Sequence, residues 1–579
     1  MRAVGLGIQS FEKIRSNNQF YVDKTPFIGE WYRKNDDITL ITRPRRFGKT
    51  LTVDMLNCFF SRTYEGRSGL FEGLRIFSDE EMMHLQGTVP TIKLSFAGVK
   101  GKTFRELLRA IAGRISILLD GFRYLVTDGV LNEDEKKLFE EMSRTIPRIP
   151  DPQADEEAYQ EFLYKLSHIL HLLSIWLFRC HGKKVYIFLD EYDTPIQAAY
   201  LNHYYEEAIE FLRDMFAESF KDNDQMARAV ITGITRIAKE SLFSEMNNLA
   251  VYSVMSGGYD DVFGFTEDEM HTVLEEFDLI EQEGLIRNWY DGFSIGNMTK
   301  IYNPWSVISY LSKREYPPED YWAQSGGLAL VDYLLKKSGI AVKKGFETLL
   351  GGGTICRRIR EDLIFPRLDT DENAVWSLLV AAGYLKPVKE SGNSPVTGLS
   401  VTNHESMICL SELVKGWFEG SSGNYMEKFA DALLRGDLYE MNEEFSQAVL
   451  ICASTFDSAR KPSEGNAQPE NFFHGLTLGM LTCLSEDYQL TSNRESGLGR
   501  YDVSIEPRDR KEYSRAFILE FKVFSEKEGD VILADTAKRA RKQIDEKKYD
   551  TDLLSRGFPP DAVEKYGFGF RGKEVLITA

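Results

Sequence analysis

A short apolar run near the N-terminus leads directly into a basic, glycine-containing loop, and this junction constrains the fold more than any other feature. Residues 37–44 read DITLITRP, and residues 43–51 read RPRRFGKTL. Such a run followed by a glycine turn predicts a buried strand, a tight loop and the start of a helix. The backbone N–H groups of a loop and helix start of this kind face phosphate oxygens. The segment therefore predicts a P-loop.

The side chains of this loop suit a nucleoside triphosphate. Lys49, which follows Gly48, would contact the β- and γ-phosphates, and the hydroxyl of Thr50 would be a Mg²⁺ ligand. The pattern GxxxxGK[ST] is met except at Arg43, which stands where the first glycine belongs. A chance GKT in a basic turn is the alternative interpretation.

A second segment supplies the acids that complete such a site. Residues 185–193 read VYIFLDEYD, a continuous apolar strand that ends in carboxylates. We expect Asp190 to hold Mg²⁺ through water and Glu191 to polarise the attacking water as general base. A buried strand with a solvated acidic turn would look similar, but both halves in this order favour a site for ATP and Mg²⁺.

Strands and helical stretches alternate over the first half of the chain, which predicts a mostly parallel sheet with helices on both faces. The region that follows is mainly helical in pattern, and its aromatic residues, including Trp305 and Trp322, are expected to pack those helices. We expect an α/β chain of three domains. These are an N-terminal P-loop NTPase sheet at 1–270, a helical middle domain at 271–425 and a C-terminal α/β domain at 426–579.

The strand at 227–237, ARAVITGITRI, ends in polar residues. We expect Thr232 to sense the γ-phosphate. Arg236 would either approach that phosphate or be a surface helix-cap arginine, and the sequence does not separate the two.

Four segments together resemble the AAA-ATPase-like family of bacterial proteins over residues 5 to 250. In that family an arginine-rich loop replaces the glycine-rich one, so Arg43 and Arg46 are candidate nucleotide-binding residues. The resemblance also implies that Asp23 and Lys24 lie near the nucleotide. The segments are FYVDKTPFI (20–28), ITRPRRFGKTL (41–51), IFLDEYDTPI (187–196) and ITGITRI with LFSEMNNL (231–249).

A second cluster of charged residues lies near the C-terminus. In the strand AFILEFKVF (516–524), Glu520 and Lys522 share one face of an otherwise apolar segment. Burying these charges is costly unless they are paired or bind metal. Asp502 lies on the preceding strand, so two carboxylates and a lysine predict a Mg²⁺ site at which Lys522 orients or deprotonates a water. A structural Glu–Lys pair on an exposed hairpin is the alternative.

This C-terminal pattern resembles the PD-(D/E)XK nuclease superfamily over about residues 440 to 579, which implies a restriction-endonuclease-like fold. By that resemblance Asp502, Glu520 and Lys522 form the core triad, with Asp502 and Glu520 on the metal. Glu470 and Gln543 are accessory candidates. The matching segments are ENFFHGLTLGML (470–481), SNRESGLGRYDVSI (492–505), ILEFKV (518–523) and ARKQIDEKKY (540–549).

The helix after this cluster is rich in basic residues that could follow a phosphate backbone, although Asp545 and Glu546 make a solvated amphipathic face an equal alternative. The net charge of −19 removes any argument for nucleic-acid binding from overall basicity. The basic residues are Lys538, Arg539, Arg541, Lys542, Lys547 and Lys548.

Composition predicts the compartment of the protein. Six scattered cysteines without a CxxC pair and the lack of an apolar run near 18 residues predict a cytoplasmic protein without a membrane span.

The two candidate sites leave three hypotheses about function. The first hypothesis is an ATP-dependent, Mg²⁺-dependent nuclease acting on DNA or RNA. The second is a nucleotide-switched interaction protein with a non-cleaving nuclease fold, and the third is an ATPase with a structural C-terminal domain. The sequence leaves open whether subunits assemble, with Arg45 or Arg46 acting across an interface.

Overall fold

The structure of the protein is a computed structural model with two compact units. Unit 1 comprises Met1–Leu334, Arg357–Thr397 and Thr402–Ser406, and unit 2 comprises Leu335–Cys356, Gly398–Val401 and Met407–Ala579. The described residues are 2–144, 148–237, 242–243, 246–322, 329–337, 340–350, 352–363, 365–368, 370–388, 396–419, 425–456, 477, 480–481, 484, 487–492, 495–496, 499–500, 502–511, 513–572 and 574–579.

Unit 1 is built on a parallel five-stranded sheet in the order β2-β3-β4-β1-β6. All residues of β1 and β3 are buried, as expected for parallel strands covered on both faces. Because β4 lies between β1 and β3, the P-loop strand and the acidic strand end on either side of the strand that carries Thr232. The strands are β1 (Ile38–Thr42), β2 (Thr91–Ser95), β3 (Val185–Asp190), β4 (Met226–Gly233) and β6 (Leu249–Tyr252).

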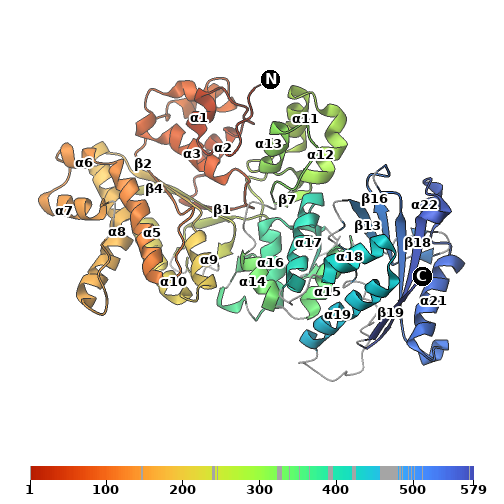
Figure 1. Cartoon of the computed structure of the whole chain (residues 1–579). Helices are drawn as coiled ribbons and strands as arrows, with labels where there is room; N and C mark the ends of the chain where they lie inside the picture. The colour runs from red at the N-terminus through yellow and green to blue at the C-terminus, as the bar shows by residue number, and fades with distance from the viewer. Residues whose placement is uncertain are drawn as a thin grey trace. The chain divides into compact units, whose positions relative to one another are not determined.

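Helices cover both faces of this sheet, as the alternating pattern predicts. Figure 1 shows α1 to α3 on one side and α5, α9 and α10 on the other. The helices are α1 (Phe11–Ser16), α2 (Pro26–Lys34), α3 (Lys49–Phe60), α4 (Glu80–Met83), α5 (Phe104–Asp120), α6 (Tyr124–Thr127), α7 (Glu133–Met142), α8 (Glu156–His181), α9 (Thr194–Leu201) and α10 (Tyr205–Phe216).

The middle of the chain is mainly helical, with short strands between the helices. Its helices are α11 (Glu267–Glu276), α12 (Glu283–Tyr290), α13 (Pro304–Ser312), α14 (Ala329–Lys337), α15 (Ile340–Leu350), α16 (Glu372–Ala382) and α17 (His404–Glu419). The strands from the end of β4 onward are β5 (Arg236–Ile237), β7 (Phe293–Ile295), β8 (Met298–Ile301), β9 (Ile355–Arg357), β10 (Asp362–Leu363), β11 (Leu385–Val388) and β12 (Thr397–Val401). Among the described residues, no helix is both long and apolar enough to cross a bilayer.

Unit 2 contains a second five-stranded sheet, in the order β13-β16-β17-β18-β19. The central strands β17 and β18 run parallel, and the other neighbours are antiparallel. The strands are β13 (Tyr488–Ser492), β16 (Val503–Pro507), β17 (Ala516–Val523), β18 (Val563–Arg571) and β19 (Glu574–Thr578), and the helices are α18 (Tyr425–Arg435), α19 (Leu438–Phe456), α21 (Leu533–Glu546) and α22 (Thr551–Ser555).

The two faces of this second sheet are buried by different helices (Figure 1). Phe517, Leu519 and Phe521 of β17 belong to a core cluster with buried residues of α18 and α19. The alternate residues Ala516 and Ile518 belong to a cluster with Ile544 of α21. The period of two along β17 thus directs Glu520 and Lys522 toward the α21 face.

Two glycines of β18 let α21 lie directly on the sheet. A Cβ added at Gly567 would come within 2.3 Å of the backbone nitrogen of Arg541, and one at Gly569 within 2.7 Å of that of Ala537. These positions pair with Glu520 and Lys522 across the parallel ladder. The close approach therefore brings a helix next to the two charged residues of β17.

Candidate functional site

The loop between β1 and α3 has the backbone of a phosphate-binding turn. Gly48 is the N-cap of α3 and has a φ of 85°, a conformation that glycine adopts without strain. Arg46 also has a positive φ, 65°. The Nζ of Lys49 donates to the carbonyl oxygens of Arg43 and Pro44 at 2.9 and 2.7 Å. Burial lowers the pKa of Lys49 to about 8, even though nearby carboxylates oppose the shift.

Asp190 joins the two halves of the nucleotide motif. The Thr50 hydroxyl donates to its Oδ2 at 2.8 Å, and the Thr232 hydroxyl donates to its Oδ1 at 2.6 Å. Ser95, at the end of β2, donates to Oδ2 at 3.3 Å. Asp190 is only 1% exposed, so hydroxyls from three separate elements hold this carboxylate at the carboxyl edge of the sheet.

Glu191 follows Asp190 in an unusual backbone conformation, with a φ of 55°. Non-glycine residues held at positive φ cluster at functional sites, where the surrounding structure maintains the strain. Its Oε2 accepts from the Thr194 hydroxyl at 3.2 Å. Burial, followed by the charge of Asp190, raises the pKa of Glu191. The carboxylate is therefore a stronger proton acceptor than an exposed glutamate.

Asp193 is a buried acid of the site that sequence reasoning missed, although it is the third carboxylate of the run 190–193. Its Oδ2 accepts from the backbone N–H groups of Ile234 and Thr235 at 3.1 and 3.0 Å and from the Thr235 hydroxyl at 2.8 Å. A Cβ at Gly233 would lie 2.6 Å from the Tyr192 ring. The segments at the C-terminal ends of β3 and β4 are thereby packed together.

The structure directs Arg43 into the fold instead of toward the centre of the loop. Its side chain is fully buried and donates to the carbonyl oxygens of Thr42, Tyr252, Gly258 and Tyr259 at 2.8 to 3.3 Å. Burial lowers its pKa to about 10. An arginine at this position therefore anchors the P-loop to the segment after β6.

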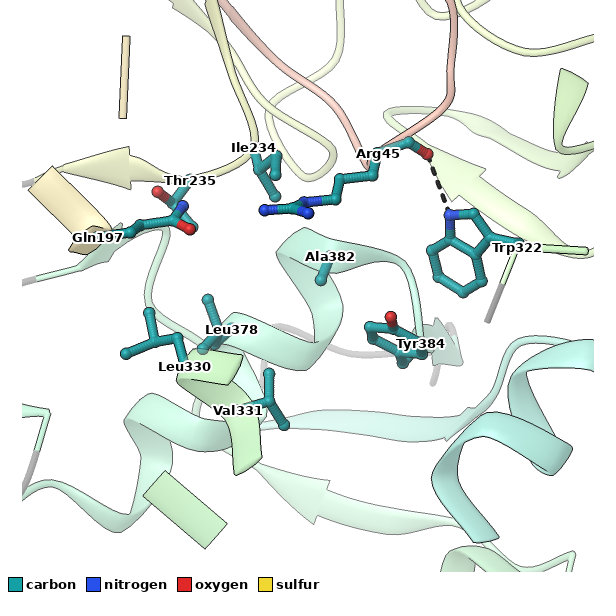
Figure 2. Close-up of a pocket in the computed structure, with 10 residues that line it drawn as sticks. All are labelled: Arg45, Gln197, Ile234, Thr235, Trp322, Leu330, Val331, Leu378, Ala382 and Tyr384. Carbon is teal, nitrogen blue, oxygen red and sulfur yellow. Dashed lines mark hydrogen bonds between the residues drawn. The ribbon is translucent and has the colours of Figure 1, made fainter. Parts of the chain in front are cut away.

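The other two arginines of the loop contact tryptophans of the middle region. The guanidinium of Arg46 lies 3.9 Å from the ring centroid of Trp305, and the indole N–H of Trp322 donates to the carbonyl oxygen of Arg45 at 3.1 Å. Figure 2 shows the Arg45 side chain extending toward Thr235. Trp322 packs against Phe293 and Tyr384, as expected for a core tryptophan of the middle region, and both Trp305 and Trp322 also contact the loop.

Three other candidates form hydrogen bonds or ion pairs with residues other than Asp190 and Lys49. Arg236 is in β5, where its Nε lies 2.6 Å from the Oδ1 of Asp362 in β10. Asp23 accepts from the backbone N–H groups of Thr25 and Arg75. Lys24 pairs with Glu269 at 2.6 Å. Each of these interactions ties neighbouring segments of unit 1 together.

In unit 2 the register of the β16–β17 ladder determines how the second cluster of charged residues, Asp502, Glu520 and Lys522, is arranged. Val503 pairs with Leu519 and Ser504 with Ile518, so one further step along the antiparallel ladder places Asp502 opposite Glu520. The Oδ2 of Asp502 accepts from the backbone N–H of Phe521 at 2.7 Å. The Nζ of Lys522 lies 3.5 Å from the Oε1 of Glu520.

Glu520 is 2% exposed, and Gln543 of α21 donates to its Oε1. Its Oε2 is buried and has no hydrogen-bond partner among the described residues. Burial, followed by the charge of Asp502, raises the pKa of Glu520 to about 9. An unsatisfied buried carboxylate oxygen next to a second carboxylate fits a divalent cation, which would supply the missing positive charge. Among the described residues, no group of three His, Cys, Asp or Glu side chains surrounds a common point.

Three of the six basic residues named for this segment form ion pairs with nearby acids. Arg541 pairs with Asp545 at 2.6 Å and Lys542 with Glu546 at 3.2 Å. Arg539 contacts Asp530 at 2.6 Å. The sequence left a phosphate-binding face and a solvated amphipathic face open, and these pairs favour the second for this part of α21. The accessory candidate Glu470 lies outside the described residues.

The two arrangements define a class of protein in which a P-loop nucleotide domain is followed by a metal-nuclease-type domain. The chain matches two family models, described as a predicted AAA-ATPase over residues 5–243 and as the PD-(D/E)XK nuclease superfamily over residues 468–579. The chain thus combines an AAA-ATPase-like domain with a PD-(D/E)XK-type domain. It is similar to "Uncharacterized protein in vnfD 5'region" of Azotobacter chroococcum mcd 1, with 26% identity over 571 residues, 96% of this chain and 94% of the relative.

Proposed function

We propose that the protein binds and hydrolyses ATP and is a metal-dependent nuclease that cuts nucleic-acid phosphodiesters, its cleavage being controlled by the nucleotide. The bond between Asp190 and Thr50 supports this proposal most strongly, because these residues lie 140 positions apart in the chain. Thr50 belongs to the P-loop half of the motif, and Asp190 belongs to the acidic-strand half. Hydroxyl and carboxylate oxygens are the ligands that Mg²⁺ prefers, so the pair would hold this ion next to the phosphates.

Residues around this pair have distinct roles in the proposed hydrolysis. Lys49 would leave the carbonyl oxygens of its own loop and contact the β- and γ-phosphates. Glu191 would accept a proton from the attacking water at a carboxylate whose pKa is raised by burial. Thr232 holds Asp190 in place and would reach the γ-phosphate only by exchanging that hydrogen bond.

In the proposed nuclease site, Asp502 and Glu520 would hold the divalent cation, which supplies charge stabilisation and a more acidic water. Lys522 would orient the water, since its ammonium already lies beside Glu520. Gln543 keeps the Glu520 carboxylate in one orientation from the neighbouring helix. We infer that this activity belongs in the cytoplasm, which the free thiols of Cys58 and Cys180 support.

Cleavage of mixed DNA and RNA with Mg²⁺, measured with and without ATP, tests the proposal directly. We expect Mg²⁺-dependent cleavage that changes when ATP is added, together with release of inorganic phosphate. ATP turnover beside inert nucleic acid would overturn the nuclease part and leave the ATPase part standing.

A nucleotide-switched interaction protein with a non-cleaving nuclease fold is the second candidate function. The pairing of Arg541 and Lys542 with acids of their own helix favours it, because paired cations are less available to a phosphate backbone. Nucleic-acid binding and cleavage, each measured with Mg²⁺ and with EDTA, separate the two candidates. ATP binding without either activity in both conditions would support the second.

A further inference from the structure

The P-loop is contacted from outside its own domain core by two indole rings. Trp305 stacks on the exposed guanidinium of Arg46, and Trp322 donates its ring N–H to the main chain at Arg45. Trp305 itself donates from its indole to the carbonyl oxygen of Tyr321, the residue before Trp322. Two consecutive loop residues are therefore contacted by two tryptophans, and Trp305 also contacts the segment of Trp322.

One buried carboxylate holds both tryptophan segments. Glu405 is fully buried, and its Oε1 accepts from the backbone N–H of Trp322 at 2.6 Å. The hydroxyl of Ser306, the neighbour of Trp305, lies 3.0 and 2.8 Å from its two oxygens. Asn303 caps the same turn by accepting from the N–H groups of Trp305 and Ser306. Hydrogen bonds thus connect Glu405 to the segment of each tryptophan, and each tryptophan contacts the loop.

Burying the Glu405 carboxyl group costs free energy of folding, so stability alone does not account for its position. Burial is the largest influence on Glu405 and raises its pKa to about 8, against the hydrogen bonds that lower it. Apolar side chains would fill such a position without this cost. The hydrogen bonds that this carboxylate accepts come from Ser306 and from the backbone N–H of Trp322, one in each tryptophan segment.

Trp322 also shapes the space beside Arg45. Its ring packs against Tyr384 at a centroid distance of 4.5 Å and against Phe293 at 5.7 Å. Figure 2 shows Trp322, Tyr384 and Arg45 around one pocket, with the Arg45 side chain directed toward Ile234 and Thr235 after β4. A shift of Trp322 would therefore move both the main chain and the side-chain surroundings of Arg45.

We propose that Glu405 is a positioning residue for the nucleotide site, which holds Trp305 and Trp322 so that they fix Arg46 and Arg45 in the geometry that receives nucleotide. This inference rests on the proposed ATP-binding function. Glu405 itself touches neither the loop nor the phosphates. On binding, Arg46 would contact nucleotide phosphate while its guanidinium stays on the Trp305 ring, so Trp305 emission would report the contact directly.

The experiment compares Glu405→Ala and Glu405→Gln in the full chain for the Kd of Mg-ATP, for kcat and for tryptophan emission. Alanine leaves the buried N–H of Trp322 without an acceptor, and we expect binding about tenfold weaker with a smaller emission change at saturating ATP. The amide oxygen of glutamine still accepts that bond, so Glu405→Gln should stay within about twofold of the wild type. Ser309→Ala, at a second buried serine of α13, is the matched control.

A second pair of variants keeps the test decisive if Glu405→Ala does not fold. Trp305→Leu should weaken ATP binding about threefold by removing the ring from Arg46, and Trp305→Phe, which keeps an aromatic face, should restore most of it. The ATP-induced emission change should be lost in both. Wild-type affinity and turnover in folded Glu405→Ala, or in Trp305→Leu, would overturn the positioning role.

Lys49→Ala, measured in parallel, separates this inference from the proposed function. If the wild type binds ATP and Lys49→Ala does not, ATP binding stands and the Glu405 variants decide the positioning role alone. If the wild type itself shows no affinity for Mg-ATP, the proposed function fails, and the positioning role fails with it.

Discussion

Burial shifts the pKa of several ionisable side chains of this protein, among them Lys49, Glu520 and Glu405. Glu405 makes this testable by pH. Its folded pKa, about 8, lies above the usual value of 4.5, so the native state holds a proton that the unfolded chain has lost. Its contribution to stability is complete below pH 4.5 and is lost as pH rises toward 8, at no more than about 1.4 kcal/mol per pH unit.

Denaturant unfolding between pH 4.5 and 9 checks this prediction. Glu405→Gln stays neutral throughout, so the decline should be shallower in that variant than in the wild type. Asp320 is the acid whose charge also raises the pKa of Glu405. Equal slopes in the two proteins would show that Glu405 is ionised in the folded state.

Lys49 gives the second prediction for a single residue. Removing its ammonium should abolish ATP binding, a loss of at least about a hundredfold, because this ammonium is the group proposed to contact the β- and γ-phosphates. Stability should hardly fall, since burial already disfavours the charged form. Lys93→Ala is the control, because Lys93 pairs with Asp54 in the same domain. Equilibrium dialysis with labelled ATP and thermal melts measure both effects, and retained affinity in Lys49→Ala would refute the P-loop assignment.

Sequence patterns predicted the elements that carry the candidate nucleotide site better than the contacts that its residues make. The spacing from Gly48 to Thr50 and the strand that ends at Asp190 could be predicted, because local periodicity and turn chemistry determine them. The hydrogen bonds of Arg43 could not be predicted, because their acceptors are carbonyl oxygens more than 200 residues away in the chain. The reach of Trp305 to Arg46 likewise depends on tertiary packing.

For secondary-structure elements, close packing of α21 on β18 determines the geometry of the second constellation. Gly567→Ala would force a Cβ to within 2.3 Å of helix backbone, so the helix must move away from Glu520. We expect a loss of about 1–3 kcal/mol of unfolding free energy and a smaller rise in melting temperature on adding Mg²⁺. Gly113→Ala in α5 meets no atom within 4 Å and should be neutral or stabilising.

Thermal melts of these two variants with and without Mg²⁺ test the role of the close contact. Unchanged stability and an unchanged response to Mg²⁺ in Gly567→Ala would mean that α21 does not fix Gln543 against Glu520. The sequence predicted β17 and its alternation correctly. The antiparallel register with β16 and the parallel pairing with β18 required the fold, because strand pairing is a long-range property.

At the level of the whole molecule, the part of the chain between the two family matches contributes to the nucleotide site. The matches end at residue 243 and resume at residue 468, yet Trp305, Trp322 and Glu405 lie between them and contact the P-loop or its partners. All three belong to unit 1, and the chain enters unit 2 directly after Ser406. The segment that carries Glu405 is therefore covalently continuous with the second unit.

The two constellations lie in separate compact units, each with its own core, so substitutions should act on them independently unless nucleotide couples them. Asp502→Ala should remove cleavage, by at least about a hundredfold, and leave ATP turnover unchanged, because it deletes one of two carboxylates for the cation. Asp561→Ala, the same change at an exposed position, is the control. Lys49→Ala retains Asp502 and should nevertheless lose the ATP response of cleavage. Wild-type cleavage in Asp502→Ala would remove the metal site, whereas an intact ATP response in Lys49→Ala would assign that response to something other than the P-loop.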